Sequence, residues 1–428
     1  MLPFVKGSSI FSLQFPAGSQ RIARLTKPLQ SAIIELEHTG KDDTMKLMHL
    51  ADLHLGVSLH RYSLQAEQTE MLQSLCRIAG EEKPDAILIA GDVYDRSIPP
   101  VYATQMLDTF LAALSRIARV FVISGNHDSA ERLAFLSEPL ERGGLHISPV
   151  YRGTVTPITL ADANGPVDIW LVPYLKPAYV RPWFPDETLE NTNEALRCAL
   201  AHLKLDPSRR NVLVAHQFVS GGKVSESAMA QLATADVYVG GIDMVDAHLF
   251  APFDYVALGH LHQAQNVGSE RIRYCGTPMA YDFYEANAVK SVTMVELAGD
   301  RSLSIREIPI PQPRPLVEVR GSFDEVTGTE AIRQADRNAY THVILTDDQP
   351  VPDVLNRLRQ VYPYLTHLDW DNARTRHEAD FSAAADVKKH TPASLFAEFF
   401  QTMNHADMTP EQSDYVDQLI REIWEDKA

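Results

Sequence analysis

Short apolar runs that stop at a polar residue recur along the chain. Residues 46–51, 86–90 and 120–123 are rich in aliphatic side chains and stop close to Asp or Gly, and residues 211–215 and 255–258 repeat the pattern. Short runs of this kind, bounded by turn-forming residues, are typical of buried strands. We therefore expect five strands whose following polar residues lie at their carboxyl ends, where open α/β sheets place their ligands.

Amphipathic helical segments alternate with these strands. Residues 65–78 place Met71, Leu72 and Leu75 on one face, and residues 103–117 carry a comparable apolar stripe. Such stripes are typical of helices that pack on a core and are not cofactor-binding motifs. The alternation of strands and helices predicts an α/β domain that begins at Met45.

The polar segments after the five strands contain three acids, one amide and five imidazoles. They are Asp52-Leu53-His54, Gly91-Asp92, Gly125-Asn126-His127-Asp128, His216 and Gly259-His260-Leu261-His262. Carboxylate and imidazole together suit Mn, Fe or Zn, whereas Mg and Ca sites are built mostly from oxygen. Because this set is too large for one ion, it predicts a two-metal site with one bridging carboxylate.

Each segment taken alone also has an ordinary structural explanation. A single histidine at a strand end, such as His216, is more often a buried, hydrogen-bonded side chain than a ligand, and Asp is common where a strand enters a turn. The ordered conjunction of all five segments favours the metal site. Asp95, His49 and His60 lie near the segments but fit no ligand position, so we expect a structural role for them.

The order of these motifs resembles the calcineurin-like metallophosphoesterases. The matching pattern is D-x-H, then G-D, then G-N-H-D, then a single His, then G-H-x-H. The resemblance implies an α/β fold in four layers, a metallophosphoesterase β-sandwich flanked by helices. It also implies two divalent metal ions, with Mn favoured and Fe or Zn as alternatives.

The resemblance further implies a role for each site residue. One ion would be held by Asp52, His54 and His262. The other would be held by Asn126, His216 and His260, with Asp92 bridging the two. His127 would be the catalytic imidazole that binds no metal, and Asp128 is a candidate for orienting it.

Two loops lie near these motifs. Residues 271–278 read as a short strand followed by a Gly/Pro turn, which the resemblance places beside the metals; an ordinary tight turn is the alternative. The segment between Ser220 and Gly241 is bracketed by glycines and could line the substrate groove.

A proline-rich linker divides the chain. Pro309, Pro311, Pro313 and Pro315 force an extended backbone over residues 307–315. The predicted parts are a disordered extension or misassigned start over 1–44, a phosphoesterase domain over 45–306, a cap domain over 316–390 and C-terminal helices over 391–428. The cap is expected to have strands at 316–320, 340–346 and 365–370 and helices near 329–337 and 352–361.

The C-terminal segment has two amphipathic helical patterns. The first stripe consists of Leu395, Phe396, Phe399, Phe400 and Met403, and the second of Tyr415, Val416, Leu419, Ile420, Ile423 and Trp424. Thr409-Pro410-Glu411-Gln412 provides a helix start with a capping-box Gln. Two short helices of this kind have to bury their apolar faces against another protein or against their own chain.

Composition and charge set outer limits on the function. The chain has 428 residues, 45% of them hydrophobic, and no apolar run long enough to span a bilayer. Cys76, Cys198 and Cys275 are far apart and odd in number, which predicts a reducing compartment. Residues 1–44 show no secretory cleavage pattern, so a cytoplasmic location is expected. The net charge of −17 is unusual for a nucleic-acid binder, although metal ions offset the acids that bind them.

The whole layout resembles the nuclease subunits of bacterial SbcCD-type complexes. This resemblance implies a metal-dependent DNA nuclease with double-strand exonuclease and hairpin or single-strand endonuclease activity. Such a nuclease hydrolyses phosphodiester bonds within an ATP-dependent complex for DNA repair, recombination and replication. The implied partners are DNA, an SbcC-type ATPase that receives the C-terminal helices, and a second copy of the chain within a heterotetramer. No membrane partner is expected.

Two alternatives and one departure accompany this prediction. A small-molecule phosphodiesterase or a phosphoprotein phosphatase uses the same two-metal centre, but neither needs the cap domain and the C-terminal helices. The other alternative is a scaffold protein, which the complete set of metal ligands disfavours. In archaeal relatives a substrate-facing His follows the bridging acid, where this chain has Asp95, so an auxiliary role is not expected at that position.

Overall fold

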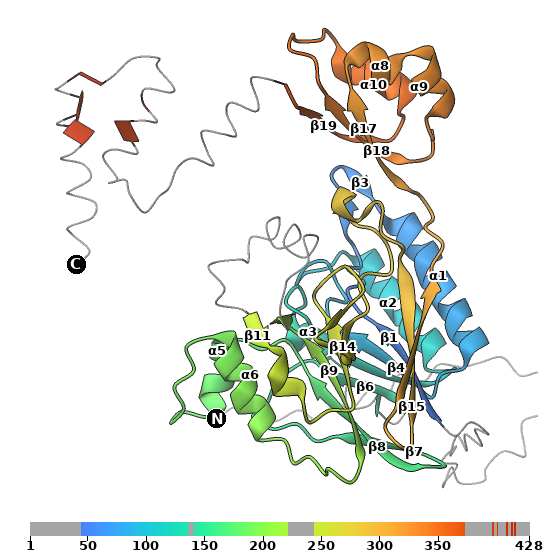
Figure 1. Cartoon of the computed structure of the whole chain (residues 1–428), viewed down its shortest axis with the longest axis vertical. Coiled ribbons are helices and arrows are strands. Elements are labelled where there is room, and N and C mark those ends of the chain that lie inside the picture. Colours follow the sequence, from blue (N-terminus) through green and yellow to red (C-terminus); the bar gives the residue numbers. More distant parts are fainter. Residues whose placement is uncertain are drawn as a thin grey trace, which may run out of the picture. The chain divides into compact units, whose positions relative to one another are not determined.

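Two six-stranded sheets form the centre of the fold (Figure 1). The computed structural model describes residues 44–135, 140–141, 143–220 and 244–372, together with residues 396–397, 400, 408–409, 412–413 and 415–416. The predicted extension over residues 1–44, apart from Thr44, lies outside the described residues. So do the glycine-bracketed segment between Ser220 and Met244 and most of the C-terminal segment.

The first sheet has the strand order β16-β15-β1-β4-β5-β6. Its strands are β1 (Thr44–Leu50), β4 (Ala86–Ala90), β5 (Arg119–Ile123), β6 (Leu145–Ser148), β15 (Ser291–Ala298) and β16 (Leu303–Pro309). β1, β4, β5 and β6 are parallel, while β15 and β16 run antiparallel to their neighbours. The three strands predicted from the first apolar runs are therefore confirmed.

The second sheet has the order β13-β14-β12-β9-β8-β7. Its strands are β7 (Ile158–Asp162), β8 (Gly165–Val172), β9 (Arg210–His216), β12 (Tyr255–Gly259), β13 (Gln265–Val267) and β14 (Ser269–Tyr274). β8, β9, β12 and β14 are parallel, and antiparallel hairpins close both edges. β9 and β12 are the two strands predicted from the later apolar runs.

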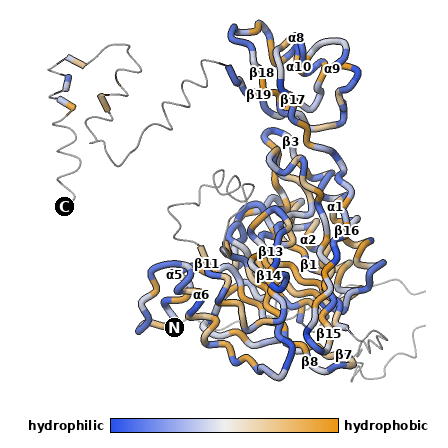
Figure 2. Tube along the Cα trace, viewed as in Figure 1, coloured by the Kyte–Doolittle hydropathy of each residue, from blue (hydrophilic) through white to orange (hydrophobic). Residues whose placement is uncertain are grey.

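Alternating side chains explain why the two sheets stack. Successive residues of a strand point to opposite faces, so Leu47 of β1 lies in the core between the sheets while Met48 faces the helices. Phe121 from the first sheet and Val214 from the second are fully buried in the same inter-sheet core. The hydrophobic residues accordingly gather on the central strands (Figure 2).

Helices cover the outer face of each sheet. α1 (Gln65–Glu82) and α2 (Val101–Leu114) pack on the first sheet, and α5 (Pro177–Val180) and α6 (Thr192–Ala201) pack on the second. The predicted four-layer arrangement, a β-sandwich flanked by helices, is confirmed. The short elements are β2 (Ser58–Leu59), β3 (Tyr62–Ser63), α3 (Ala130–Leu133), η1 (Arg181–Trp183), β10 (Phe218–Ser220), β11 (Met244–Asp246), η2 (Ala247–Phe250) and η3 (Phe283–Glu285).

A smaller parallel sheet follows the proline-rich segment. It contains β17 (Leu316–Gly321), β18 (Tyr340–Leu345) and β19 (Leu365–Trp370), joined by α8 (Phe323–Thr327), α9 (Thr329–Gln334) and α10 (Val354–Val361). The three predicted strands are confirmed. α8 was not predicted, although Ser322 and Glu325 form its capping box. We call this unit the cap.

The linker begins later than the sequence predicts, and its arginine contacts both the first helix and the cap. Pro309 is the last residue of β16, an edge strand, and pairs with Ser291, so the extended linker begins after it. Arg314 then donates from Nε to Glu67 Oε1 at 3.0 Å and lies over the Tyr364 ring at 3.8 Å.

No helix in the described ranges is long and apolar enough to cross a membrane.

Candidate metal centre

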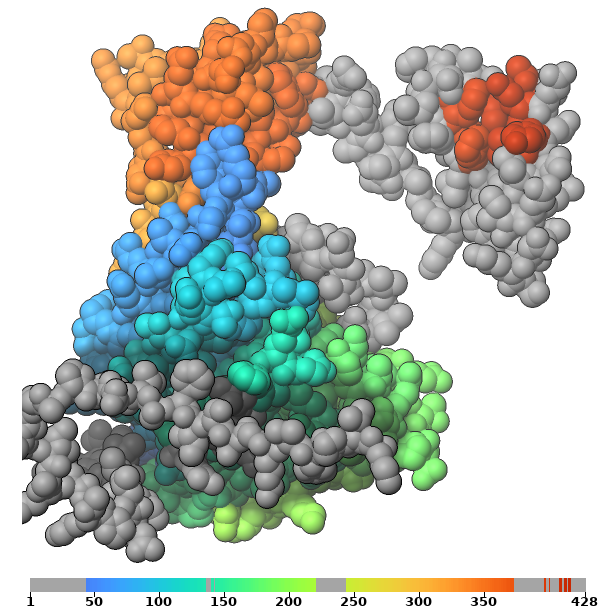
Figure 3. All heavy atoms as spheres, turned by 180° about the vertical axis from the view of Figure 1, so that it is seen from behind, coloured from blue at the N-terminus to red at the C-terminus, as the bar shows by residue number. Residues whose placement is uncertain are grey.

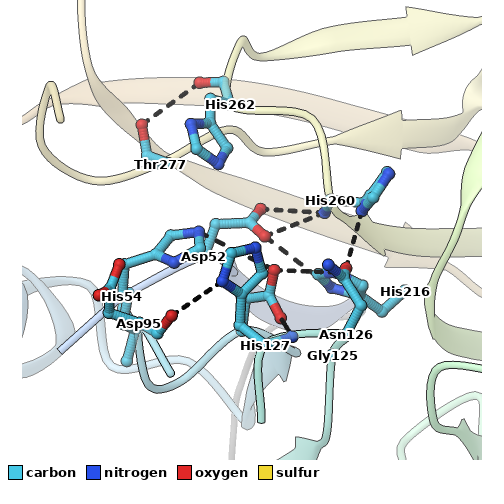
Figure 4. A network of polar contacts seen from close by, with 12 residues as sticks. Asp52, His54, Asp95, Gly125, Asn126, His127, His216, His260, His262 and Thr277 are labelled. Carbon is cyan, nitrogen blue, oxygen red and sulfur yellow. Dashed lines mark hydrogen bonds and ion pairs between the residues drawn. The ribbon is translucent and has the colours of Figure 1, made fainter. Parts of the chain in front are cut away.

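The carboxyl ends of five strands, drawn from both sheets, converge on one cluster of polar side chains (Figure 4). β1, β4 and β5 belong to the first sheet and β9 and β12 to the second. The side chains that meet there are Asp52, His54, Asp92, Asn126, His127, His216, His260 and His262. The structure thus brings together every residue of the predicted site.

Four of these residues occupy left-handed backbone conformations. Asp52, His54, Asp92 and His260 have φ values of 53°, 42°, 46° and 109°. Non-glycine residues avoid this region, because each such residue costs ~1–3 kcal/mol and persists only where surrounding contacts compensate. Here the loops hold one another, because the Asp52 and His54 N–H groups donate to the carbonyls of Gly91 and Asp92, both at 3.0 Å.

One half of the cluster is centred on Asn126. Its Oδ1 lies 3.0 Å from His216 Nε2 and 3.0 Å from His260 Nδ1. The other ring nitrogen of His216, Nδ1, donates to the Ala90 carbonyl at 2.8 Å. This bond fixes the tautomer, so His216 presents an unprotonated Nε2 to the cluster when the ring is neutral.

The other half contains Asp52, His54 and His262. The rings of His54 and His262 lie 5.0 Å apart between centroids, and Asp52 accepts the backbone N–H of His260 at 3.0 and 3.1 Å. Asp92 lies between the halves, with Oδ2 at 3.2 Å from His216 Nε2 and 3.9 Å from His54 Nε2. Its position is that of a group shared by both halves.

The four predicted ligand histidines differ in protonation. Burial opposes protonation of His216 and His262, yet Asp92 raises the pKa of His216 to about 9 and Glu285 raises the pKa of His262, so each carries a proton that a bound cation would displace. Burial lowers the pKa of His54 and of His260 to about 3, so both imidazoles are neutral, as ligands must be. Burial opposes ionisation of Asp92, yet His216 holds the pKa of that carboxyl well below its usual range. Burial raises the pKa of Asp52 to about 7, a cost that a bound cation would offset.

A further observation tests whether these residues fit metal ions. The Nε2 atom of His54 is buried without a hydrogen-bond partner among the described residues. Buried polar atoms rarely lack a hydrogen-bond partner, and a metal ion would provide the missing partner. The donor set of carboxylate, amide and imidazole groups matches Mn, Fe or Zn, so the residues present fit the predicted ions.

His127 differs from the rest of the cluster because its side chain is exposed. Its Nδ1 donates to the backbone carbonyl of Asp95 at 2.8 Å, and its ring meets that of His54 edge to face at 4.8 Å. Asp128 was expected to orient His127, and that prediction is wrong. The Asp128 carboxylate instead accepts the backbone N–H groups of Val93, Tyr94 and Gly125 at 2.9–3.1 Å.

Comparison with known proteins identifies the family. A family model described as calcineurin-like phosphoesterase matches residues 45–264, just over half of the chain. The SbcD subunit of nuclease SbcCD from Staphylococcus epidermidis is 30% identical over 380 residues, which cover 88% of this chain and 98% of that protein. The chain belongs to the SbcD family of calcineurin-like phosphoesterases.

Other matches extend over the remaining sequence of this SbcD family member. The SbcD subunit of nuclease SbcCD from Staphylococcus saprophyticus is 29% identical over 390 residues, which cover 89% of this chain and 99% of that protein. A model described as type 5 capsule protein repressor C-terminal domain matches residues 312–404. Family membership makes the chain a phosphodiesterase-type hydrolase that uses divalent metal ions.

The SbcD fold also supplies supporting residues that the sequence did not reveal. His262 Nδ1 lies 3.0 Å from Glu285 Oε1, and the buried Lys290 pairs with the other oxygen of Glu285. Lys290 Nζ also donates to the His262 carbonyl at 3.0 Å and to Thr277 Oγ1 at 2.7 Å. The Gly276-Thr277-Pro278 turn therefore lies beside His262, where the resemblance placed it.

The charge of Glu285 follows from these contacts. Burial opposes its ionisation, but the hydrogen bond with His262 and the Lys290 ammonium lower the pKa of Glu285 to about 2. A carboxylate on the far nitrogen of a ligating histidine fixes the ring and its tautomer. Glu285 and Lys290 belong to a segment without a recognisable motif, so only the fold could connect them to His262.

Two histidines near the motifs lie outside the cluster. His49 is buried between the sheets, with Nδ1 2.9 Å from the Tyr255 hydroxyl. His60 stacks on His367 of the cap. Neither belongs to the ligand groups that the described side chains form at the metal centre, and their structural role stays a prediction.

Proposed function

We propose that this chain is the catalytic nuclease component of an SbcCD-type complex and hydrolyses phosphodiester bonds in DNA. The observation that carries the proposal is the similarity to the SbcD subunit of the Staphylococcus epidermidis nuclease over 98% of that relative's length. The convergence of carboxylate and imidazole groups at the strand ends supports it independently. The proposed activities are a double-strand exonuclease and a hairpin or single-strand endonuclease that serve DNA repair, recombination and replication.

The proposed ligand assignment follows the two halves of the cluster. One ion would be held by Asp52, His54 and His262. The other would be held by Asn126, His216 and His260, and Asp92 would be shared by both. Mn is the proposed metal. When bound, the two ions neutralise the anionic oxygens of the phosphodiester, which otherwise repel a nucleophile.

His127 is proposed as the catalytic acid. Its bond from Nδ1 to the Asp95 carbonyl holds the ring in place and leaves Nε2 available to a substrate. As a water oxygen bonds to phosphorus and the bond to the leaving oxygen breaks, protonated His127 gives its Nε2 proton to the leaving oxygen, and the attacking water loses a proton to solvent. The ring is exposed while the adjacent His54 and Asp92 are buried, as this role requires.

The proposed partners follow the same reasoning. An SbcC-type ATPase would receive the C-terminal segment, and two copies of this chain would join it in a heterotetramer. A cytoplasmic location is proposed because Cys76, Cys198 and Cys275 are all free thiols in the structure.

One assay separates the proposed function from its alternatives. The purified chain with Mn²⁺ is incubated with linear duplex DNA, hairpin DNA and bis(p-nitrophenyl) phosphate, and the His127→Ala variant serves as the matched control. Cleavage of both DNA substrates that is lost in the variant supports the nuclease. Hydrolysis of the small ester alone indicates a small-molecule phosphodiesterase. Absence of all three reactions in the wild type indicates a scaffold protein.

A further inference from the structure

A second cluster of imidazole and carboxylate groups lies on the cap sheet, away from the strand ends that form the metal centre. Asp369 Oδ2 is 2.9 Å from His342 Nε2, and Asp369 Oδ1 is 3.0 Å from His367 Nε2. One ligand atom from each of the three side chains lies within 4.8 Å of the others. Three potential metal ligands therefore face one point.

Strand register places the three side chains on one face of the cap. His342 of β18 is paired directly with His367 of β19, and Asp369 follows two residues later on the same strand. The intervening residues point the other way: Val343 is fully buried against the cap helices and Leu368 packs on the same core. The cluster is thus set by the pleat of the sheet.

Neighbouring groups hold both imidazoles in place. Glu318 Oε2 lies 3.3 Å from His342 Nδ1, the nitrogen that faces away from Asp369. This arrangement is the one by which a carboxylate orients a ligating histidine. On the other ring, His60 stacks on His367 with the planes 5° apart and the centroids 4.8 Å apart.

The contact that holds the rings comes from the phosphoesterase domain. His60 belongs to the turn between β2 and β3, and Phe283 of η3 lies 5.2 Å from the His342 ring. Figure 3 shows the blue segment that carries this turn against the orange cap. The Tyr62 hydroxyl at the same contact donates to the Leu365 carbonyl at 3.4 Å.

We propose that His342, His367 and Asp369 bind one first-row transition-metal ion of the zinc class. Two imidazole nitrogens and one carboxylate oxygen are the ligand set of such ions, and three protein ligands leave a position for water. The side chains of His367 and Asp369 are 46% and 52% exposed, so an ion can enter from solvent, while His342 is 12% exposed and firmly placed. The bound ion would tie β18 to β19 at the surface that meets the phosphoesterase domain.

Metal stoichiometry of the full chain provides the first test. Wild type and the double variant His367→Gln/Asp369→Asn are dialysed against Zn²⁺, and bound zinc is counted by mass spectrometry. We expect the variant to bind one Zn²⁺ fewer per chain. The matched control is His248→Gln/Asp246→Asn, which alters an exposed pair 2.8 Å apart that belongs to no three-residue ligand group among the described residues; its zinc content should equal that of the wild type.

The second test needs no variant, so misfolding cannot obscure it. Crystals of the unmodified chain soaked in Zn²⁺ are measured at the zinc absorption edge. An anomalous peak among His342, His367 and Asp369, apart from any at Asp92, supports the proposal. Equal zinc content in wild type and variant, or no peak at the cap while the centre around Asp92 is filled, would show that Asp369 only hydrogen-bonds the two rings.

Discussion

The Asp92 carboxylate faces a ring nitrogen from each half of the metal centre, His216 Nε2 and His54 Nε2. Replacement of Asp92 by Ala removes the only proposed ligand that the two ions share. We expect the metal content of the variant to fall well below two ions per chain and DNA cleavage to fall to background. Elemental analysis and a nuclease assay check this, and a variant that retains two ions and wild-type turnover would show that Asp92 is not the bridge.

His127 allows binding to be separated from chemistry. In the proposed mechanism it holds no metal, so His127→Ala should retain its ions and its affinity for DNA. Cleavage should fall by ~10²- to 10⁴-fold, the usual effect of losing a general acid or base. The ring does lie within ligand reach of His54 and Asp92. Metal content of the variant decides the question, since loss of an ion would place His127 among the ligands.

At the scale of elements, η3 and the segment after it support one side of the metal centre. Glu285→Gln keeps the size of the side chain but removes the charge that faces His262 and Lys290. We expect affinity for the catalytic metal to fall by ~10- to 100-fold, the usual effect of losing such a supporting group. Competition with a fluorescent chelator measures this.

The control for that experiment is Glu270→Gln, which changes an exposed acid on β14. Its metal affinity should equal that of the wild type. An unaltered affinity in Glu285→Gln, with far-UV circular dichroism showing a folded chain, would mean that Glu285 does not position His262.

Arg210 links the two sheets of the sandwich. From β9 it makes two hydrogen bonds to Asp162, at 2.5 and 2.8 Å, and it donates to the Leu297 carbonyl of β15 at 3.2 Å. Asp162→Asn leaves the buried guanidinium without its counter-charge. We expect the free energy of unfolding at pH 7 to fall by about 3 kcal/mol, as measured by urea denaturation. The exposed helix pair of Glu81 and Arg77 provides the control, because Glu81→Gln should have little effect.

The effect of Asp162→Asn should depend on pH. Burial opposes ionisation of Asp162, but the hydrogen bonds from Arg210 keep the pKa of that carboxyl below its usual range. A carboxyl whose pKa is lowered by folding stabilises the protein at pH values above its pKa in the unfolded chain, which is about 3.9. This contribution is lost as the pH falls through the pKa that the carboxyl has in the folded protein. The difference between wild type and variant should therefore be full at pH 7 and shrink below pH ~4. A constant difference would rule out the ionised pair as its cause.

Elements and site residues differed in how far the sequence could predict them. β4 and β9 were predictable because the fully buried residues 86–90 and 212–215 form continuous apolar runs. The meeting of Asp52 with His260 was predictable because each follows such a run. The bonds of Asp128 and the proximity of Glu285 to His262 were not predictable, since they depend on how loops from distant segments fold over one another. α8 was missed because five residues are too few to show a helical period.

At the scale of the whole molecule, the C-terminal segment is expected to bind the ATPase. By resemblance its apolar stripes dock on the coiled-coil base of an SbcC-type protein, with the aromatic residues as anchors. Truncation after His390 should leave a folded, metal-loaded protein that still cuts simple DNA ends but no longer co-purifies with the ATPase.

The same truncation also tests the alternative, in which the stripes pack on this chain's own core. In that case the shortened protein would aggregate or lose its cooperative melting transition. Differential scanning calorimetry, performed together with the co-purification, distinguishes the two outcomes. If the stripes pack on the chain's own core, the surface that binds the partner lies elsewhere.

The turn η3 has a consequence for communication within the molecule. Phe283 packs on His342 of the cap and Glu285, two residues later, contacts His262 at the metal centre. A ligand or partner that favours one placement of Phe283 would therefore alter the affinity of the centre for its ions. Thermodynamic reciprocity then requires that filling the centre alter the affinity of the cap for that ligand by the same factor. The coupling free energy can be measured in two ways. Either the affinity of the centre for its ions is compared with and without the cap ligand, or the affinity of the cap for its ligand is compared with and without the ions.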